Sequence, residues 1–213
     1  MITEQHVVES IENAIDGKSN LTEQQLSVGG FSTKTMRHLW NNLCDIDGVY
    51  LECGLFKGGT FVASFNKNCQ SIGIEDYSQP FGESNVKSIL EENIEANKGL
   101  SKDCKVFFED CFSIDKAKLP SNIDILFYDA EHSAESQSKA LPYFLDNMNQ
   151  TFLYVVDDAN WSDVYRGTMD GLEQVKDKIV VLRDWHISGE LSNDDSIWHN
   201  GIMIFLCQKT ISE

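Results

Sequence analysis

The sequence is short of positive charge, of proline and of long apolar runs. Its 213 residues include 17 lysines and arginines against 34 aspartates and glutamates, which gives a net charge of −17. A nucleic-acid backbone binds a cationic surface that displaces its counterions, so this composition disfavours nucleic acid as a ligand. No segment approaches the roughly 20 apolar residues of a membrane span, and the first residues do not follow a signal-peptide pattern. We therefore expect neither a membrane protein nor a secreted one.

Cysteine is present, but not in a pattern typical of metal sites or disulfide frameworks. None of the six cysteines belongs to a C-x-x-C pair or to a Cys/His cluster with zinc spacing. We therefore expect reduced thiols and a cytoplasmic location. With three prolines, no repeat and no low-complexity stretch, the sequence predicts one domain over residues 1–213. We interpret residues 1–47 as an N-terminal helical extension or lid, and residues 48–213 as the core.

The N-terminal extension has helical periodicity. Apolar residues recur every three or four positions in Glu4–Ile15, and the next residues are Asp and Gly, which end helices. Ser32 or Thr33 can cap a second helix. The apolar stripe of that second helix consists of Met36, Leu39, Trp40 and Leu43.

From Gly48 onward, short apolar runs alternate with polar stretches of helical length. Continuous Val, Ile, Leu and Phe runs predict strands buried on both faces, and helix-length connections predict right-handed crossovers between parallel strands. The pattern therefore predicts an α/β three-layer sandwich. The predicted strands are Val49–Cys53, Ser71–Ile74, Lys105–Phe108, Ile123–Tyr128, Phe152–Val156, Ile179–Leu182 and Ile202–Cys207. The predicted helices are Thr60–Asn66, Asn85–Asn97, Ser113–Lys118, Ser133–Asn149 and Trp161–Val175.

A polar segment without helical periodicity, residues 183–200, joins the last two strands. A connection of this kind predicts a terminal antiparallel hairpin with a long loop. The loop contains Trp185, His186, Trp198 and His199. A wall of a substrate site and ordinary structural packing both explain these aromatic residues.

A glycine-rich turn follows the first predicted strand. Glycine permits a positive φ and the close approach of a ligand, and a helix that begins there offers free N–H groups. The spacing is neither the G-x-G-x-x-G of dinucleotide-binding proteins nor that of a P-loop, and a tight strand–helix turn explains it as well. The candidate cofactor-binding residues of this turn are Glu52, Gly54, Gly58, Gly59 and Thr60.

Two further strand ends extend this candidate site. Glu75 and Asp76 follow the second strand, with Glu75 placed 21 residues after Gly54. A carboxylate at this position of an α/β sheet accepts hydrogen bonds from ribose hydroxyls. Asp110 and Cys111 follow the third strand, where they would lie beside an adenine. The three strand ends predict a site for a nucleoside cofactor, although strand-end acids without this role are common in so acidic a chain.

Aspartates and a histidine mark the ends of the fourth and fifth strands. Asp129 ends the fourth, and Asp157 and Asp158 end the fifth. Because neighbouring strands lie ~4.8 Å apart, these carboxylates should converge and favour a bound cation. Oxygen ligands suit Mg²⁺, Ca²⁺ or Mn²⁺. His132 lies three residues after Asp129 and can accept a proton from a hydroxyl bound there. The alternative is that the acids cap helices and that His132 is a surface residue.

From Gly48 to Gln208 the sequence resembles class I S-adenosylmethionine-dependent methyltransferases. The segment Glu52–Thr60 resembles the first motif of the family, and Glu75 its ribose-binding acid. The resemblance implies a seven-stranded sheet in the order 3-2-1-4-5-7-6, with the seventh strand antiparallel. It also implies that S-adenosylmethionine is the cofactor.

The acidic cluster resembles the metal-dependent O-methyltransferase branch of this family. Asp129 and Asp157 are 28 residues apart, as in catechol-type enzymes, and Asp158 takes the place of a third ligand. His132 stands where the catechol type has a catalytic lysine, and Asp158 where it has an asparagine. Both differences are closer to the macrolide-sugar O-methyltransferases. The resemblance implies that these three acids bind the metal and that His132 and Asp129 are catalytic, with Asp129 also contacting the cofactor.

The function implied is a metal-assisted O-methyltransferase acting on a hydroxyl of a small molecule. Its cofactors would be S-adenosylmethionine and a divalent cation, with Mg²⁺ the expected ion. One alternative is a metal-independent methyltransferase in which Asp129 and His132 contact the substrate directly. The other is a non-catalytic protein of this fold that binds a nucleoside or serves as a partner subunit. A homodimer is compatible with each of these hypotheses.

Overall fold

Seven strands form one sheet in the order β3-β2-β1-β4-β5-β7-β6. The computed structural model describes residues 2–79, 83–190, 194–195 and 197–210. β7 pairs antiparallel with both of its neighbours, and the other pairs are parallel. The strands are β1 (Gly48–Cys53), β2 (Cys69–Ile74), β3 (Asp103–Phe107), β4 (Ile123–Tyr128), β5 (Met148–Asp157), β6 (Ile179–Ile187) and β7 (Ile202–Lys209).

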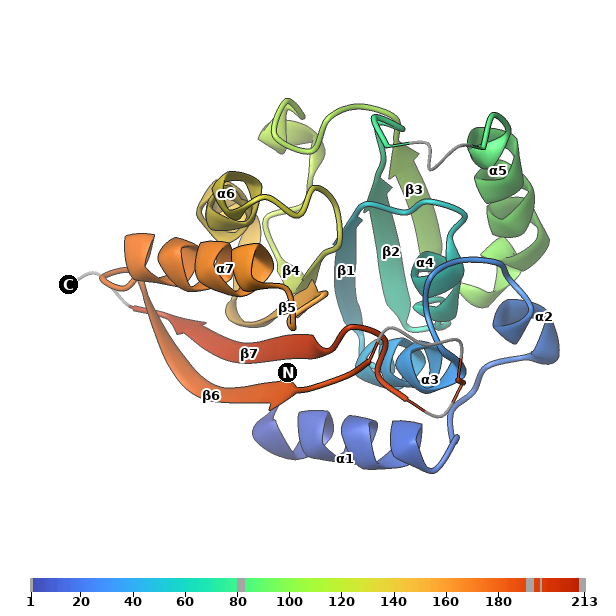
Figure 1. Cartoon of the computed structure of the whole chain (residues 1–213), viewed down its shortest axis with the longest axis horizontal. Helices are drawn as coiled ribbons and strands as arrows, with labels where there is room; N and C mark the ends of the chain where they lie inside the picture. Colours follow the sequence, from blue (N-terminus) through green and yellow to red (C-terminus); the bar gives the residue numbers. More distant parts are fainter. Residues whose placement is uncertain (1, 80–82, 191–193, 196, 211–213) are drawn as a thin grey trace.

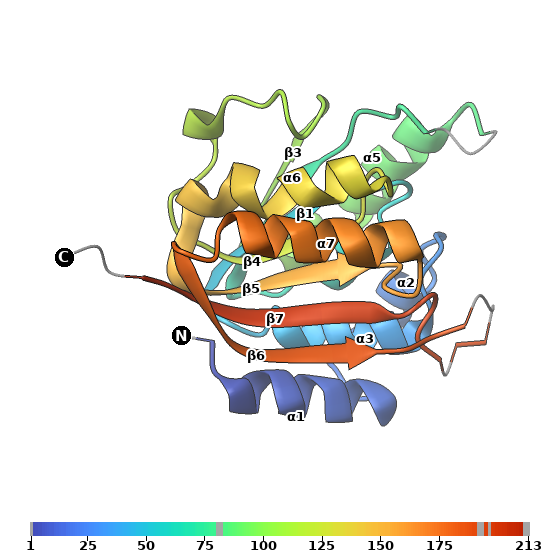
Figure 2. The same ribbon diagram turned by 60° about the vertical axis from the view of Figure 1, so that its left-hand side comes forward.

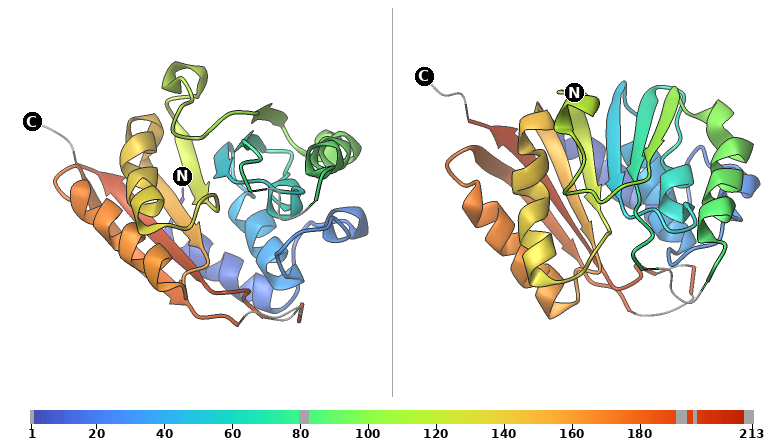
Figure 3. Two further views of the ribbon diagram at one scale, coloured as in Figure 1. Left: turned by 45° about the horizontal axis from the view of Figure 1, so that its top comes forward. Right: turned by 90° about the horizontal axis from the view of Figure 1, so that it is seen from above.

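Helices cover both faces of this sheet and make three layers. α6 and α7 lie on one face, and α1 and α3 lie on the other (Figures 1 and 2). The view from above shows α4 and α5 on the side opposite α6 and α7 (Figure 3). The helices are α1 (Glu4–Ile15), α2 (Glu23–Leu26), α3 (Lys34–Leu43), α4 (Gly59–Ala63), α5 (Val86–Asn97), α6 (Ala134–Phe144) and α7 (Ser162–Gln174). None of the helices in the described residues is long and apolar enough to cross a bilayer.

The central strands are buried on both faces because their side chains alternate between two apolar cores. In β4, Leu126 and Tyr128 pack into the core under α6 and α7. Ile125 and Phe127 pack into the core that includes α1, α3 and α4. This alternation explains the continuous apolar runs in the sequence. The predicted α/β three-layer sandwich, its strand order and its antiparallel last strand are confirmed.

Several predicted boundaries were wrong. The sixth strand continues to Ile187, so its second half is paired with β7 and does not belong to the loop. The predicted helix over residues 113–118 is only a 3₁₀ turn at Lys116–Lys118, and the helix predicted to run to Asn149 ends at Phe144. The short α2 was not predicted, although Thr22 and Gln25 form a capping box there. Residues 191–193 and 196 of the predicted late loop lie outside the described residues.

The strand ends bring the candidate residues together through backbone hydrogen bonds. The N–H of Gly54 donates to the carbonyl of Ile74 at 3.0 Å, and the N–H of Asp129 donates to the carbonyl of Cys53 at 2.9 Å. The ladder therefore continues beyond β1, and the residues that follow β1, β2 and β4 lie side by side. The same edge of the sheet carries the end of β5, because β4 and β5 are parallel.

Candidate functional site

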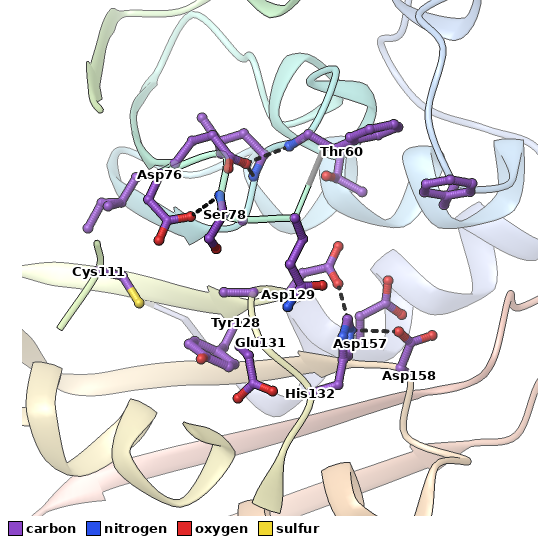
Figure 4. Close-up of a pocket in the computed structure, with 18 of the residues that line it drawn as sticks. Thr60, Asp76, Ser78, Cys111, Tyr128, Asp129, Glu131, His132, Asp157 and Asp158 are labelled. Atoms are coloured by element: carbon purple, nitrogen blue, oxygen red, sulfur yellow. Dashed lines mark hydrogen bonds and ion pairs between the residues drawn. The ribbon is translucent and has the colours of Figure 1, made fainter. Parts of the chain in front are cut away.

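A cavity of about 410 Å³ lies at this edge of the sheet, and Figure 4 shows part of its lining. Of the residues proposed from sequence, Glu52 and Gly58 do not line it. The others do: Gly54, Gly59, Thr60, Glu75, Asp76, Asp110, Cys111, Asp129, His132, Asp157 and Asp158. The strand ends that were separate in the sequence therefore contribute to a single cavity.

The turn after β1 depends on glycine at two positions. Gly54 has a φ of +89°, and a Cβ atom there would lie 2.1 Å from the carbonyl oxygen of Asp129. Gly58 has a φ of +86° and is the N-cap of α4, beside Leu90. These glycines let the chain leave β1 in close contact with the end of β4. Gly58 thus permits the backbone conformation of the turn without lining the cavity, whereas Gly54 forms part of the cavity wall.

Glu75 ties this turn to the end of β2. Its Oε2 atom accepts hydrogen bonds from the N–H groups of Leu55 at 2.7 Å and Phe56 at 2.8 Å. Its Oε1 atom accepts a hydrogen bond from the N–H of Tyr77 at 2.7 Å. The carboxylate lines the cavity between the glycine turn and β2. It therefore organises the turn and faces the space in which a nucleoside would bind.

Glu52 is enclosed behind the cavity wall and has no exposed surface. The hydroxyls of Tyr50 and Thr60 both donate to its carboxylate at 2.5 Å. Burial raises the pKa of Glu52 well above its ordinary value, although these two hydrogen bonds favour the charged form. Glu52 consequently contacts the candidate site through Thr60, which lines the cavity.

The opposite end of the cavity holds a cluster of Asp129, His132 and Asp158 (Figure 4). The Nε2 atom of His132 lies 2.8 Å from Oδ2 of Asp158 and 3.7 Å from Oδ1 of Asp129. One potential ligand atom from each residue lies within 4.8 Å of the others. The sequence placed Asp157 in this group, but the convergent set contains His132 instead.

Burial and mutual charge shift the pKa values in the cluster. Burial raises the pKa of Asp129 to about 6, with His132 opposing the rise and the charge of Asp158 adding to it. Burial alone would lower the pKa of His132, but contacts with the two carboxylates outweigh it and raise that pKa to about 10. The imidazole and its carboxylates therefore form an ion pair at neutral pH.

Asp157 lies next to the cluster but is enclosed more deeply. Only 5% of its surface is exposed, and its Oδ1 atom has no hydrogen-bond partner within the described residues. Burial, together with the charges of Asp129 and Asp158, raises its pKa well above the ordinary value. An unpartnered buried carboxyl oxygen is costly, so this position favours a ligand that supplies positive charge or a donor.

The left-handed residues of the fold gather around the cavity. Apart from glycine, the described residues with positive φ are Phe56, Tyr77, Asp158 and Asn200, and each of them lines the cavity. Such conformations are uncommon outside glycine and concentrate at functional sites. Asp158 is held in this conformation by the side-chain amide of Asn200, which donates to its Oδ1 atom at 2.6 Å.

Sequence reasoning missed the aromatic walls of the cavity. Phe31, from the segment between α2 and α3, stacks on Phe56 with ring centroids 5.0 Å apart. Trp161, after β5, lies 5.2 Å from the His132 ring. Phe31 and Trp161 expose 59% and 48% of their surface. The position of Phe31 directly after Gly29-Gly30 could have marked it as an aromatic residue in a turn. The local sequence does not indicate that its side chain reaches the turn after β1.

The N-terminal extension and the late loop meet beside this cavity. The Thr33 hydroxyl donates to the carbonyl of Ile197 at 2.6 Å, and the Thr35 N–H donates to the carbonyl of Asp195 at 3.1 Å. Each segment contributes lining residues, among them Ser32 and His199. The extension is therefore part of the site.

This sheet order and the cavity at its carboxyl edge define the class I S-adenosylmethionine-dependent methyltransferase fold. An O-methyltransferase from Bacillus cereus, solved in complex with S-adenosylhomocysteine, aligns with a TM-score of 0.59 at 13% identity, over 97% of this chain and 92% of that one. A methyltransferase from Geobacter sulfurreducens aligns with a TM-score of 0.58 at 14% identity, over 97% and 90%. No protein-family model and no curated protein matches the sequence. At these identities the likeness shows the fold alone.

Proposed function

We propose that this protein is an S-adenosylmethionine-dependent O-methyltransferase that acts on a small hydroxylated molecule with the help of a divalent cation. The observation that carries the proposal is the composition of one cavity in this fold. Glu75 and the glycine turn line one end of it, and the cluster of Asp129, His132 and Asp158 lines the other. A nucleoside cofactor and a proton-accepting group would thus be neighbours.

The cofactor would bind along the ends of β1, β2 and β4. We expect Glu75 to accept hydrogen bonds from the ribose hydroxyls, since its carboxylate faces the cavity. Gly54 leaves room for close approach to the backbone, and Asp110 and Cys111 would lie beside the adenine. Asp129 continues the wall of the cavity towards the cluster, which is where the sulfonium methyl group would be presented.

The cluster fits a divalent cation. Asp129 and Asp158 offer carboxylate oxygens, the unpartnered carboxyl of Asp157 is adjacent, and the imidazole of His132 lies beside them as the proton acceptor. Asp129, Asp157 and Asp158 would hold Mg²⁺ or a similar ion. When bound, such an ion lowers the pKa of a hydroxyl that it coordinates and offsets the repulsion between the acids.

The methyl transfer itself needs alignment and a proton acceptor. The substrate hydroxyl would bind beside His132, whose Nε2 atom faces the acids. The hydroxyl oxygen attacks the sulfonium methyl group, the carbon–sulfur bond breaks, and the hydroxyl proton passes to Nε2 of His132. This step needs the neutral imidazole. A cation held by the acids would offset their charge and so lower the pKa of His132 from the raised value that the ion pair gives it. The products are a methyl ether and S-adenosylhomocysteine. Trp161, beside His132, limits the space on that side.

The ion pair between His132 and Asp158 supports one alternative, a metal-independent methyltransferase. The imidazole satisfies both acids in the absence of an ion, so the pair could bind substrate directly. Turnover after exhaustive chelation separates the two mechanisms. If S-adenosylhomocysteine formation survives EDTA and is not raised by Mg²⁺ or Mn²⁺, the metal-assisted mechanism is wrong.

Calorimetry with S-adenosylmethionine, NAD and divalent ions tests the proposal as a whole. We expect S-adenosylmethionine to bind and NAD not to bind. The variant His132→Ala should keep cofactor and metal affinity and lose roughly 10²–10⁴-fold in kcat. His186→Ala, a histidine on β6, is the matched control and should change neither. Loss of metal binding in His132→Ala would make His132 a ligand, and failure to bind S-adenosylmethionine would refute the proposed function.

A further inference from the structure

The charge of the cavity lining is one-sided. Seven carboxylates line the cavity, and the described lining residues include no lysine or arginine. We infer that the methyl acceptor carries a protonated amino group, and that the cavity discriminates against anionic acceptors. This inference rests on the proposed function and specifies its substrate class. The lining acids are Glu75, Asp76, Asp110, Asp129, Glu131, Asp157 and Asp158.

The negative charge persists after the proposed cofactors are counted. S-adenosylmethionine has a net charge of about one positive unit, and a divalent cation adds two, so three of the seven carboxylates are balanced. With the cation bound and His132 in its neutral, proton-accepting form, about four negative charges of the lining remain unbalanced. A cavity with low-dielectric walls concentrates such a field, which attracts cations and repels anions.

The cations that are close in sequence to the lining residues have other partners. Lys57 follows Phe56, but its Nζ atom lies 2.7 Å from Glu83. Arg37 lies behind Gly59, where its guanidinium donates to the carbonyl of Leu26 at 2.8 Å and is almost completely buried. Neither side chain lines the cavity. An anionic substrate would therefore find neither lysine nor arginine among the described lining residues, and the imidazole of His132 is already paired with Asp158.

Glu131 is the acid best placed to select the substrate. Its carboxylate lines the cavity but lies apart from the cluster of Asp129, His132 and Asp158 (Figure 4). Its Oε1 atom accepts a hydrogen bond from the N–H of Ser133 at 3.0 Å, and its Oε2 atom accepts one from the Ser133 hydroxyl. Both donors are neutral, so they do not balance the charge of the carboxylate. The proposed function gives Glu131 no part in binding the cofactor or the metal. Its charge is therefore available to an ammonium group on the acceptor.

Two further observations point to a cationic ligand. The Oδ1 atom of Asp157 is buried and unpartnered at the cavity wall, so this wall favours positive charge, whether the proposed cation or the ammonium group of the acceptor supplies it. The exposed rings of Phe31 and Trp161 line the same cavity. Aromatic faces attract ammonium groups and give no comparable attraction to carboxylates. Acids and aromatic rings without basic residues are the composition expected of an amine-binding site.

Two matched series of probes test the inference without knowledge of the natural substrate. The first series is dopamine (cation), hydroxytyrosol (neutral) and homoprotocatechuate (anion). The second series is glucosamine (cation), glucose (neutral) and glucuronate (anion). Binding is measured by ligand-observed NMR on the full chain saturated with S-adenosylhomocysteine. We expect the ammonium compound to bind at least about tenfold more tightly than the carboxylate in at least one series at low salt. The preference should shrink at about 1 M salt, where the screening length is ~3 Å.

The variant Glu131→Gln should reduce the preference by a factor of about two to five, the contribution of one exposed ion pair. Glu12→Gln makes the same change of net charge on α1 and should leave the preference unchanged. Equal or tighter binding of the carboxylate compounds, or no binding of either ammonium compound at millimolar concentration, would overturn the inference. An equal effect of both variants would exclude a local role for Glu131. Because S-adenosylmethionine binding is measured separately, loss of the proposed function would be recognised as such.

Discussion

Replacement of Glu75 tests whether one carboxylate both holds the glycine turn and binds the cofactor. Glu75→Ala removes the acceptor of three backbone N–H groups, those of Leu55, Phe56 and Tyr77. A hydrogen bond to a charged acceptor stabilises the fold more than one to a neutral acceptor. In the variant, however, water in the cavity can hydrate some of these N–H groups. We therefore expect the free energy of unfolding to fall by about 2–4 kcal/mol. S-adenosylmethionine affinity should fall at least about tenfold, because charge-assisted bonds to the ribose are lost as well.

Glu75→Gln separates the two roles. One amide oxygen can still accept from Leu55 and Phe56, but the amide nitrogen then faces the N–H of Tyr77. The loss of stability should therefore be smaller, about 1–2 kcal/mol. The assays are urea unfolding and calorimetry, with Glu12→Gln as the control, since Glu12 is an exposed acid on α1 that does not line the cavity. An unfolding free energy of Glu75→Ala within about 0.5 kcal/mol of wild type would refute the structural role. Unchanged cofactor affinity would move the ribose site, with Asp76 the next candidate.

Two further substitutions test the interior of the turn. Because the fold raises the pKa of Glu52, the folded state favours its protonated form. The free energy of unfolding should therefore decrease as the pH rises above about 4.5, the ordinary pKa of the side chain. Glu52→Gln should remove this effect, and urea unfolding at about pH 5 and pH 8 should show a weaker pH dependence than in wild type; an identical dependence would contradict the assignment. Gly54→Ala puts a Cβ atom 2.1 Å from a carbonyl oxygen at positive φ, so we expect a loss of more than about 3 kcal/mol in unfolding free energy. A Gly54→Ala protein as stable as wild type would show that the end of β4 can move.

The layers and the strand order were predictable because both follow from patterns along the chain. The apolar runs around Leu51 and Leu126 are continuous since both faces of these strands are buried. The resemblance supplied the strand order. The end of β6 was not predictable in the same way, because Arg183 to Ile187 is polar on an edge strand with one open side. Pairing with β7 makes that segment a strand, and a local pattern does not reveal pairing.

The candidate site was predictable in its acids and not in its geometry. Strand ends placed Asp129 and Asp158 at one edge, and the cavity there contains both. We predicted Asp157 in the cluster, but the structure has His132 there with Asp129 and Asp158. The difference depends on the directions of the side chains around Asp158, whose φ is positive, and the sequence does not reveal those directions. The contribution of Phe31 depends on contacts between distant segments. Such contacts are set by the tertiary fold.

The last strand of the sequence lies inside the sheet, and this affects how the chain can fold during synthesis. β7 is inserted between β5 and β6, and synthesis proceeds from the N-terminus. While β7 is still missing, β5 has an unpaired edge and β6 has no partner. Val180 and Leu182 of β6 are exposed even in the complete fold. Asn200, which holds Asp158, lies two residues before β7. A nascent chain that ends before residue 202 therefore has a sheet with unpaired edges, which can pair with other chains, and its cofactor cavity is incomplete. We therefore expect the cofactor to bind only after synthesis is finished.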